Sequence, residues 1–263
     1  MHRFTLPALL IFTLAGCAST APTKTDTPTL KLDYHSQSNA PQNGKTVAII
    51  SLVIVTNDAS TTEKSFVSTL PIKLASRALK FSAVESYHEN YETPLQNAMQ
   101  SGLDEIMSKR GFTTKGPFKS IDAVPFADRK NSYLAVVPKL FLNIEQQSNS
   151  HSCMHSICTD AGSISLRGDL LIRFVDPLTE QTVRTMPIDL NGFGIRKNYV
   201  HQYPQETHKA VRQGLMYTDK ASASRIDDAN KELVDAINEF YADSMAKIDK
   251  LISAEDLLSI KTK

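Results

Sequence analysis

Residues 46–56 read Thr-Val-Ala-Ile-Ile-Ser-Leu-Val-Ile-Val-Thr, an almost unbroken run of apolar and β-branched side chains. A strand with one buried face alternates apolar and polar residues, whereas an unbroken apolar run is typical of a strand that is covered on both faces. This segment therefore predicts a strand buried on both faces, at the centre of a sheet that other elements cover.

Three further segments have the patterns of strands. Residues 133–144 and 164–175 are rich in β-branched and aliphatic side chains, and residues 182–190 follow soon after the turn signal Asp176-Pro177. Because the connection between the last two segments is short, we expect them to pair as an antiparallel hairpin.

A helix is expected between the first strand and these three. Thr93 is its predicted cap, Pro94 suits the first helical position, and apolar residues follow at spacings of three and four up to Met107. Gly111 is a typical residue at a helix end, and Phe112 begins another extended piece.

The C-terminal part of the chain predicts a long amphipathic helix over residues 226–251. Ser224 with Asp227 resembles a capping box, and Ser253 with Asp256 repeats this opening for a short last helix. The apolar stripe of the long helix fits packing on a sheet, and a coiled-coil seam is the alternative.

The order strand, helix, several strands, helix predicts the fold class. We expect an α+β or α/β fold in which two or three helices pack on a mixed sheet of about four to five strands. A disordered N-terminal tether precedes this fold in the prediction, because the segment after residue 17 is rich in Thr and Pro.

The N-terminus has the features of a bacterial export signal. Arg3 leads into an apolar run that ends at Leu14, too short to span a bilayer, which takes about 20 apolar residues. Leu14-Ala15-Gly16-Cys17 matches the lipobox of lipoproteins, so we expect cleavage before Cys17 and anchorage by acyl chains such as palmitate. Ala18 stands where an inner-membrane retention signal has Asp, which favours the outer membrane. A secretory signal that happens to hold a cysteine is the alternative.

These features divide the chain into three parts. Residues 1–16 are the expected signal peptide, residues 17–44 the lipid anchor with a largely flexible tether, and residues 45–263 a single globular domain. The sequence has 29 Lys and Arg against 28 Asp and Glu, and loss of Arg3 makes the mature chain neutral. Bulk charge therefore predicts no binding to nucleic acid.

Cys153 and Cys158 are the two cysteines that remain beside the lipidated one. In an oxidising compartment a disulfide between them is the first interpretation, and it would stiffen the tip of a hairpin. His151 and His155 stand beside them, so four ligands for zinc or copper lie close together. Metal binding and two free thiols therefore stay open as alternatives.

Residues 191–222 predict an irregular segment that gathers aromatic and basic side chains. The candidates for a ligand-binding loop are Arg196, Lys197, Tyr199, His201, Tyr203, Lys209 and Arg212, with His208 and Tyr217 nearby. Rings stack on sugar faces and an arginine fork pairs with a carboxylate, so this loop suits a sugar or an anion. A surface loop packed on the sheet is the alternative. The sequence contains no familiar catalytic or phosphate-binding motif, so we expect no enzyme and no cofactor.

Three stretches resemble the neuraminyllactose-binding haemagglutinin family, lipoproteins also described as flagellar sheath adhesins. Residues 30–35, Leu-Lys-Leu-Asp-Tyr-His, are similar to the family's opening beyond its tether. Residues 106–112 and 133–137 resemble its helix end with a Gly-aromatic turn and its Tyr-Leu-Ala-Val strand. Residues 235–238 and 248–250 resemble parts of its C-terminal helix. The resemblance implies a non-enzymatic outer-membrane or sheath lipoprotein, in a family named for binding sialylated sugar.

The sequence departs from the family at the proposed sialic-acid motif. That motif is a Lys- and Arg-rich segment soon after the Tyr-Leu-Ala-Val strand, and residues 145–160 contain neither residue here. We therefore expect an adhesin or sheath component whose sugar binding is weak or absent, unless the loop with Arg196 and Arg212 supplies the cation. The alternative is a periplasm-facing accessory lipoprotein that binds a metal or an envelope protein through the Cys153 and Cys158 hairpin.

Overall fold

The computed structural model describes residues 28–57, 83–154, 157–204 and 228–260. Its strands are β1 (Thr46–Ile50), β2 (Val53–Asn57), β3 (Thr113–Phe118), β4 (Ser132–Met154), β5 (Ile157–Val175), β6 (Thr182–Asp189) and β7 (Arg196–Pro204). Its helices are α1 (Ala83–Asn90), α2 (Glu92–Lys109), α3 (Phe126–Asn131), α4 (Asp228–Leu251) and α5 (Ala254–Ser259), with a 3-10 turn η1 (Asn191–Phe193). None of the described helices is long and apolar enough to cross a membrane.

The described strands form one mixed sheet of seven strands in the order β3-β1-β4-β5-β6, with β2 beside β4 and β7 beside β5. β1 runs parallel to β3 and β4, and β2 runs parallel to β4. β4 and β5 form a long antiparallel hairpin, and β6 and β7 pair antiparallel with different halves of β5. The predicted α+β class and the hairpin of β5 with β6 are confirmed, although the strands outnumber the four to five expected.

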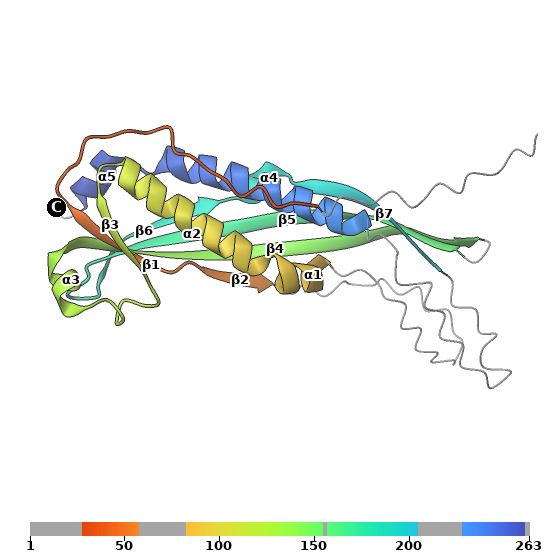
Figure 1. Cartoon of the computed structure of the whole chain (residues 1–263), viewed down its shortest axis with the longest axis horizontal. Coiled ribbons are helices and arrows are strands. Elements are labelled where there is room, and N and C mark those ends of the chain that lie inside the picture. Colours follow the sequence, from red (N-terminus) through yellow and green to blue (C-terminus); the bar gives the residue numbers. More distant parts are fainter. Residues whose placement is uncertain (1–27, 58–82, 155–156, 205–227, 261–263) are drawn as a thin grey trace, which may run out of the picture.

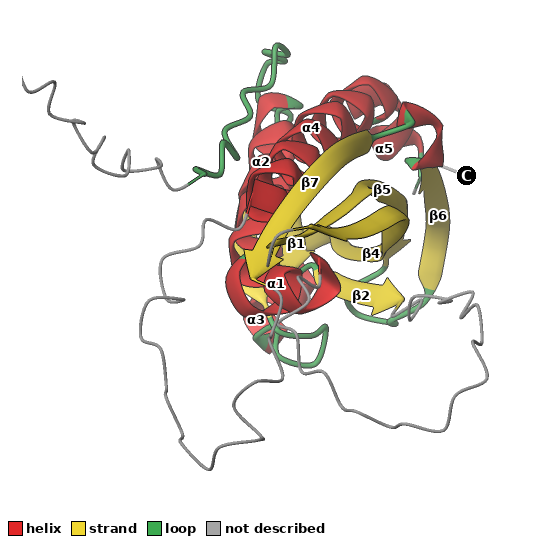
Figure 2. Ribbon diagram, turned by 90° about the vertical axis from the view of Figure 1, so that its right-hand side faces the viewer, coloured by secondary structure: helices red, strands yellow, loops and turns green. Residues whose placement is uncertain are grey.

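Helices α2 and α4 pack together on one face of this sheet (Figure 1, Figure 2). Their fully buried side chains include Leu95, Met99, Leu103 and Ile106 of α2 and Leu233, Ile237, Phe240 and Ile248 of α4. Burial of each such side chain contributes about 1.5 to 3 kcal/mol. The apolar stripe predicted over residues 226–251 therefore belongs to the core between helices and sheet, and the coiled-coil alternative is wrong.

The apolar run over residues 46–56 is interrupted, because the backbone at Leu52 bonds to a helix in place of a strand. The Leu52 N–H donates to Gln100 Oε1 at 2.6 Å, and its carbonyl accepts from Gln96 Nε2 at 2.5 Å. β1 before this break is buried as predicted. β2 after it is not buried on both faces, since the side chain of Val53 is 49% exposed.

Helix α2 begins two residues earlier than expected, because α1 leads directly into it. Tyr91 is the residue before its first turn, and the Tyr91 N–H donates to the Tyr87 carbonyl at 2.8 Å. Thr93 is therefore not the cap. Pro94 lies inside the first turn, where its missing N–H costs no intrahelical hydrogen bond.

Two other predicted helix boundaries are confirmed. Gly111 follows the end of α2 with a φ of 85°, a left-handed conformation that glycine adopts without steric cost. Ser253 Oγ accepts the Asp256 N–H at 3.0 Å and so caps α5. Ser224 and Asp227, the predicted start of α4, lie outside the described residues.

Residues 29–43, here called the strap, run beside the helices before β1 (orange in Figure 1). Leu30, Leu32 and Tyr34 pack against the main core. The Lys31 N–H donates to Asn238 Oδ1 of α4 at 2.7 Å. Much of the region predicted as tether thus lies against the body. Its beginning, residues 17–27 with Cys17, lies outside the described residues, as does the predicted signal peptide.

Candidate functional site

The predicted ligand-binding loop is, in its first part, a strand. β7 pairs with the first half of β5, from Arg196 opposite Ser165 to Pro204 opposite Ile157. The hairpin of β4 and β5, with β7 beside it, extends beyond the N-terminal end of α4 (Figure 1). We call this narrow projecting part of the sheet the arm. The irregular structure predicted for residues 191–222 is therefore wrong for residues 196–204. The backbone of these residues forms hydrogen bonds with the edge of β5, whereas the backbone of an irregular surface segment would form them with water.

A strand alternates its side chains between two faces, and β7 separates the predicted residues accordingly. Tyr199 points into the core, where its side chain is 4% exposed and its hydroxyl accepts from Gln146 Nε2 at 3.0 Å. Lys197 lies on the same face and forms an ion pair with Glu239 of α4. Tyr199 is therefore a packing residue, and the charge of Lys197 is already compensated.

The other predicted residues of this segment do not form one cluster. His201 shares the half-buried face with Lys197 and Tyr199, whereas Arg196 lies on the opposite, exposed face. The side chain of Tyr203 is not described, and Lys209 and Arg212, with His208 and Tyr217, lie outside the described residues.

We call the sheet face opposite α2 and α4 the outer face. One end of it is covered by a second small core of Ala48, Ile50, Val124, Ala135 and Val175. Farther along β4 and β5 no described helix covers it, and polar residues alternate with the buried ones there. The outer face is therefore the part of the described sheet that is open to a ligand.

Two arginines come together on the outer face. Ser165 of β5 lies opposite Arg196 of β7, and Arg167 follows two positions along β5 on the same face. Across the hairpin, Asn143 lies opposite Arg167 and Glu145 opposite Ser165. The sequence interpretation missed Arg167, because it followed the apolar half of the alternation in residues 164–175 and not the polar half.

An aromatic ring and two carboxylates complete this surface. Phe141 lies opposite Asp169, and Lys139 Nζ stands 4.8 Å from the centroid of the Phe141 ring. Asn191 Nδ2 donates to Asp169 Oδ1 at 3.0 Å and to Asp189 Oδ1 at 2.9 Å. Hydrogen bonds from the Asn191 backbone and side chain lower the pKa of Asp189 below its ordinary value. Asp189 is therefore ionised at neutral pH.

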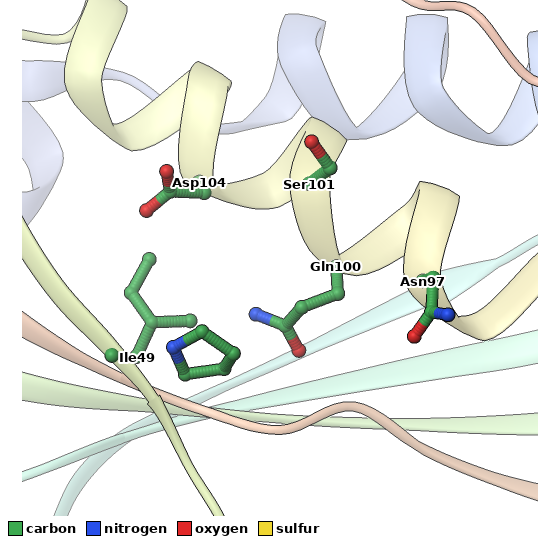
Figure 3. Close-up of a pocket in the computed structure, with 7 residues that line it drawn as sticks. Ile49, Asn97, Gln100, Ser101 and Asp104 are labelled. Atoms are coloured by element: carbon green, nitrogen blue, oxygen red, sulfur yellow. The ribbon is translucent and has the colours of Figure 1, made fainter.

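A separate hollow of about 280 Å³ lies on the helical side, between α2 and the strands β1 and β3. Its lining residues are Ile49, Asn97, Gln100, Ser101, Asp104, Gly116 and Pro117 (Figure 3). The register of the β1–β3 pair shifts between Ala48 and Ile50 at this point. Gly116 is required there, since its φ is 125° and a Cβ would stand 2.4 Å from the Ile49 carbonyl oxygen.

The chemistry of this hollow does not suit an anion. Gln100 Oε1 is held by the Leu52 N–H, which leaves the Gln100 amide nitrogen on the side of Ile49 (Figure 3). Asp104 is the one charged residue of the lining. A small neutral group with hydroxyls, or a cation, matches such walls better than a carboxylate does.

The cysteines face each other near the tip of the arm. Cys153 of β4 lies directly opposite Cys158 of β5, a backbone register that brings two Cα atoms within the range of a disulfide. The side chains of His151 and Cys153 are not described, and His155 lies outside the described residues. Over the described ranges no group of three or more His, Cys, Asp or Glu could hold a metal ion. The four-ligand site at the tip stays a prediction.

Comparison with known proteins identifies a family and relatives from Helicobacter pylori. The family model described as neuraminyllactose-binding hemagglutinin precursor matches residues 13–262. A neuraminyllactose-binding hemagglutinin of Helicobacter pylori is 22% identical, over 97% of this chain and 88% of the relative. The protein of the same name from Helicobacter pylori strain ATCC 700392 / 26695 is 21% identical with the same coverage.

A solved structure has the same fold. The crystal structure of a neuraminyllactose-binding hemagglutinin homolog from Helicobacter pylori has a TM-score of 0.53 and 16% identity, over 89% of this chain and 99% of that one. The family model spans nearly the whole sequence, which confirms the family that the sequence resembles. The chain belongs to the neuraminyllactose-binding hemagglutinin family.

Proposed function

We propose that this protein is a non-enzymatic lipoprotein of the outer membrane or the flagellar sheath, held by lipid on Cys17 and displayed as an adhesin. The observation that carries the proposal is the family match over residues 13–262, whose relatives are named as hemagglutinins and not as enzymes. A sialylated glycan is the partner that the name of these relatives suggests, and an envelope protein is the alternative partner.

The strap is consistent with a body that is held close to its membrane. From Cys17 to Thr29 the chain makes 12 steps, which reach at most about 40 Å when fully extended. Beyond Thr29 the strap is bonded to α4, since Asn238 Nδ2 donates to the Thr29 carbonyl at 3.3 Å. In this proposal the anchor joins the body through the helical layer, which lies on the sheet face opposite the outer face.

Two measurements on cells test anchorage and display. We expect labelled fatty acid to enter the wild-type protein but not Cys17→Ser, because the thiol is the acylated atom. We expect protease added to intact cells to remove the wild-type protein. Equal labelling of Cys17→Ser contradicts the anchor, and full protection from protease in cells with an intact envelope contradicts display on the surface.

We also propose that Cys153 and Cys158 form a disulfide that stiffens the tip of the arm. Their opposite register in β4 and β5 supports this pairing. A loop this short contributes only about 2 kcal/mol in the chain-entropy model, so the effect of the bond is local. Intact mass with alkylation before and after reduction decides the question. Two thiols that alkylate without reductant contradict the bond, and thiols protected until a chelator is added indicate metal.

A further inference from the structure

Residues 145–160 contain no Lys or Arg, yet the fold brings two arginines together on the outer face, where β5 meets β7. Arg167 and Arg196 are diagonal neighbours on one face, because Arg196 lies opposite Ser165 and Arg167 follows Ser165 by two positions. Diagonal neighbours in an antiparallel pair are about 7 to 8 Å apart, within reach of each other's long side chains. The Leu166 N–H to Ile195 carbonyl bond, at 3.2 Å, holds the two strands in this register.

Both guanidinium groups keep hydrogen-bonding capacity. Arg167 and Arg196 are exposed, and within the described ranges the side chain of Arg167 makes no hydrogen bond or ion pair. Arg196 Nη2 donates to Gln147 Oε1 at 3.4 Å, a long bond to a neutral group. A guanidinium has five donors in a planar fork that matches a carboxylate. The pair therefore presents one guanidinium without a partner among the described residues and a second one with a single long hydrogen bond.

We propose that the outer face at Arg167 and Arg196 is a binding site for an acidic sugar, whose carboxylate the two arginines hold. This inference rests on the proposed adhesin function and assigns its ligand site. Charge complementarity selects the carboxylate, because forked, charge-assisted hydrogen bonds are the strongest that a surface of this kind makes.

The neighbours of the arginines explain why the ligand is a sugar and not a small inorganic anion. Glu145 lies diagonally across from Arg167, and Asp169 follows Arg167 by two positions on the same face. These carboxylates repel a compact anion, but they accept hydrogen bonds from the hydroxyls that surround the carboxylate of an acidic sugar. Phe141, opposite Asp169, adds an apolar surface for the C–H face of a ring.

Titration of mature, lipid-bearing protein in detergent with sialyl-lactose and with lactose tests the site. We expect sialyl-lactose to bind at least about tenfold more tightly than lactose, and Arg167→Ala and Arg196→Ala each to weaken it by about tenfold or more. Arg167→Lys keeps the charge but not the fork, so we expect a loss there as well. The affinity also falls as salt rises.

Arg173→Ala is the matched control. Arg173 is an exposed arginine on the same strand and face, six positions from Arg167, or about 20 Å along the strand. We expect the affinity of the Arg173→Ala variant for sialyl-lactose to stay within about twofold of that of the wild-type protein. Unchanged melting temperatures exclude misfolding of the variants.

The outcomes of this experiment test the inferred site separately from the proposed adhesin function. Sialyl-lactose binding that survives both alanine variants places the site elsewhere and overturns the inference, while the adhesin role stands. Binding of lactose as tight as that of sialyl-lactose overturns the carboxylate contact. No binding of either sugar by the wild-type protein overturns the site, and the protease and labelling results on cells then still decide display and anchorage.

Discussion

Replacement of Asp249 is expected to loosen the junction between the strap and the ends of both long helices. Asp249 accepts hydrogen bonds from Arg110 Nη2 at 2.8 Å, from the Tyr34 hydroxyl at 2.7 Å and from Ser36 Oγ at 3.0 Å. The side chains of Arg110 and Asp249 are each 11% exposed. One carboxylate thus joins α2, α4 and the strap in a nearly dry environment.

The expected loss follows from these contacts. Removing one partner of a buried ion pair costs about 3 to 5 kcal/mol, because the other charge stays buried without its partner. Arg110 Nε keeps its bond to the Ile252 carbonyl at 2.6 Å, which favours the lower end of that range. Unpaired Tyr34 and Ser36 add about 1 kcal/mol each. Ala is a better helix former than Asp, and the substitution removes a negative charge from the last turn of α4. Together these two effects offset about 1 kcal/mol of the loss.

We therefore expect Asp249→Ala to lower the free energy of unfolding by about 4 kcal/mol. For a chain of this size the melting temperature then falls by about 10 °C. Urea unfolding and thermal melts of the mature protein in detergent measure both quantities. Asp235→Ala is the control, since Asp235 is an exposed acid on the same helix. A loss below about 1 kcal/mol for Asp249→Ala refutes the reasoning, because the carboxylate then contributes no more than a surface ion pair.

Three further substitutions or conditions follow from other contacts. The Tyr87 hydroxyl is buried and makes no hydrogen bond within the described residues. Tyr87→Phe should therefore raise the free energy of unfolding by about 1 kcal/mol in urea titrations, and a lower free energy of unfolding contradicts this. Gly116→Ala forces a Cβ to 2.4 Å from the Ile49 carbonyl oxygen at a φ of 125°, so we expect a loss of more than about 2 kcal/mol in the same assay, whereas Gly192→Ala, at an open position, should change little. Burial, followed by the nearby Asp33 and Glu105 carboxylates, raises the pKa of Tyr241 from 10.0 to about 12, and burial also raises the pKa values of Tyr87 and Tyr34. The neutral forms are thus favoured in the folded state, stability is complete below pH 10 and falls between pH 10 and 12, and a melting temperature that stays level over that window contradicts the assignment.

The local sequence pattern was sufficient to predict the features whose physical cause acts within a few residues. The hydroxyl of Ser253 capping α5, the left-handed Gly111 after α2 and the apolar stripe of α4 depend on neighbours in the chain, and the sequence predicts all three. The α+β class follows from the order of such elements. The family could also be predicted from the sequence, because its short motifs lie in the same order along the chain.

The tertiary structure decided the features that depend on contacts between distant residues. β1 and β2 are separate strands because Gln96 and Gln100, more than forty positions away, take the backbone hydrogen bonds of Leu52 between them. Residues 196–204 became a strand because β5 had a free edge, and its alternation buried Tyr199 and exposed Arg196. Arg167 and Arg196 are 29 positions apart in the sequence, and only the register of β5 with β7 makes them neighbours. Pairing between strands sets which side chains share a face, and no pattern within one strand contains that information.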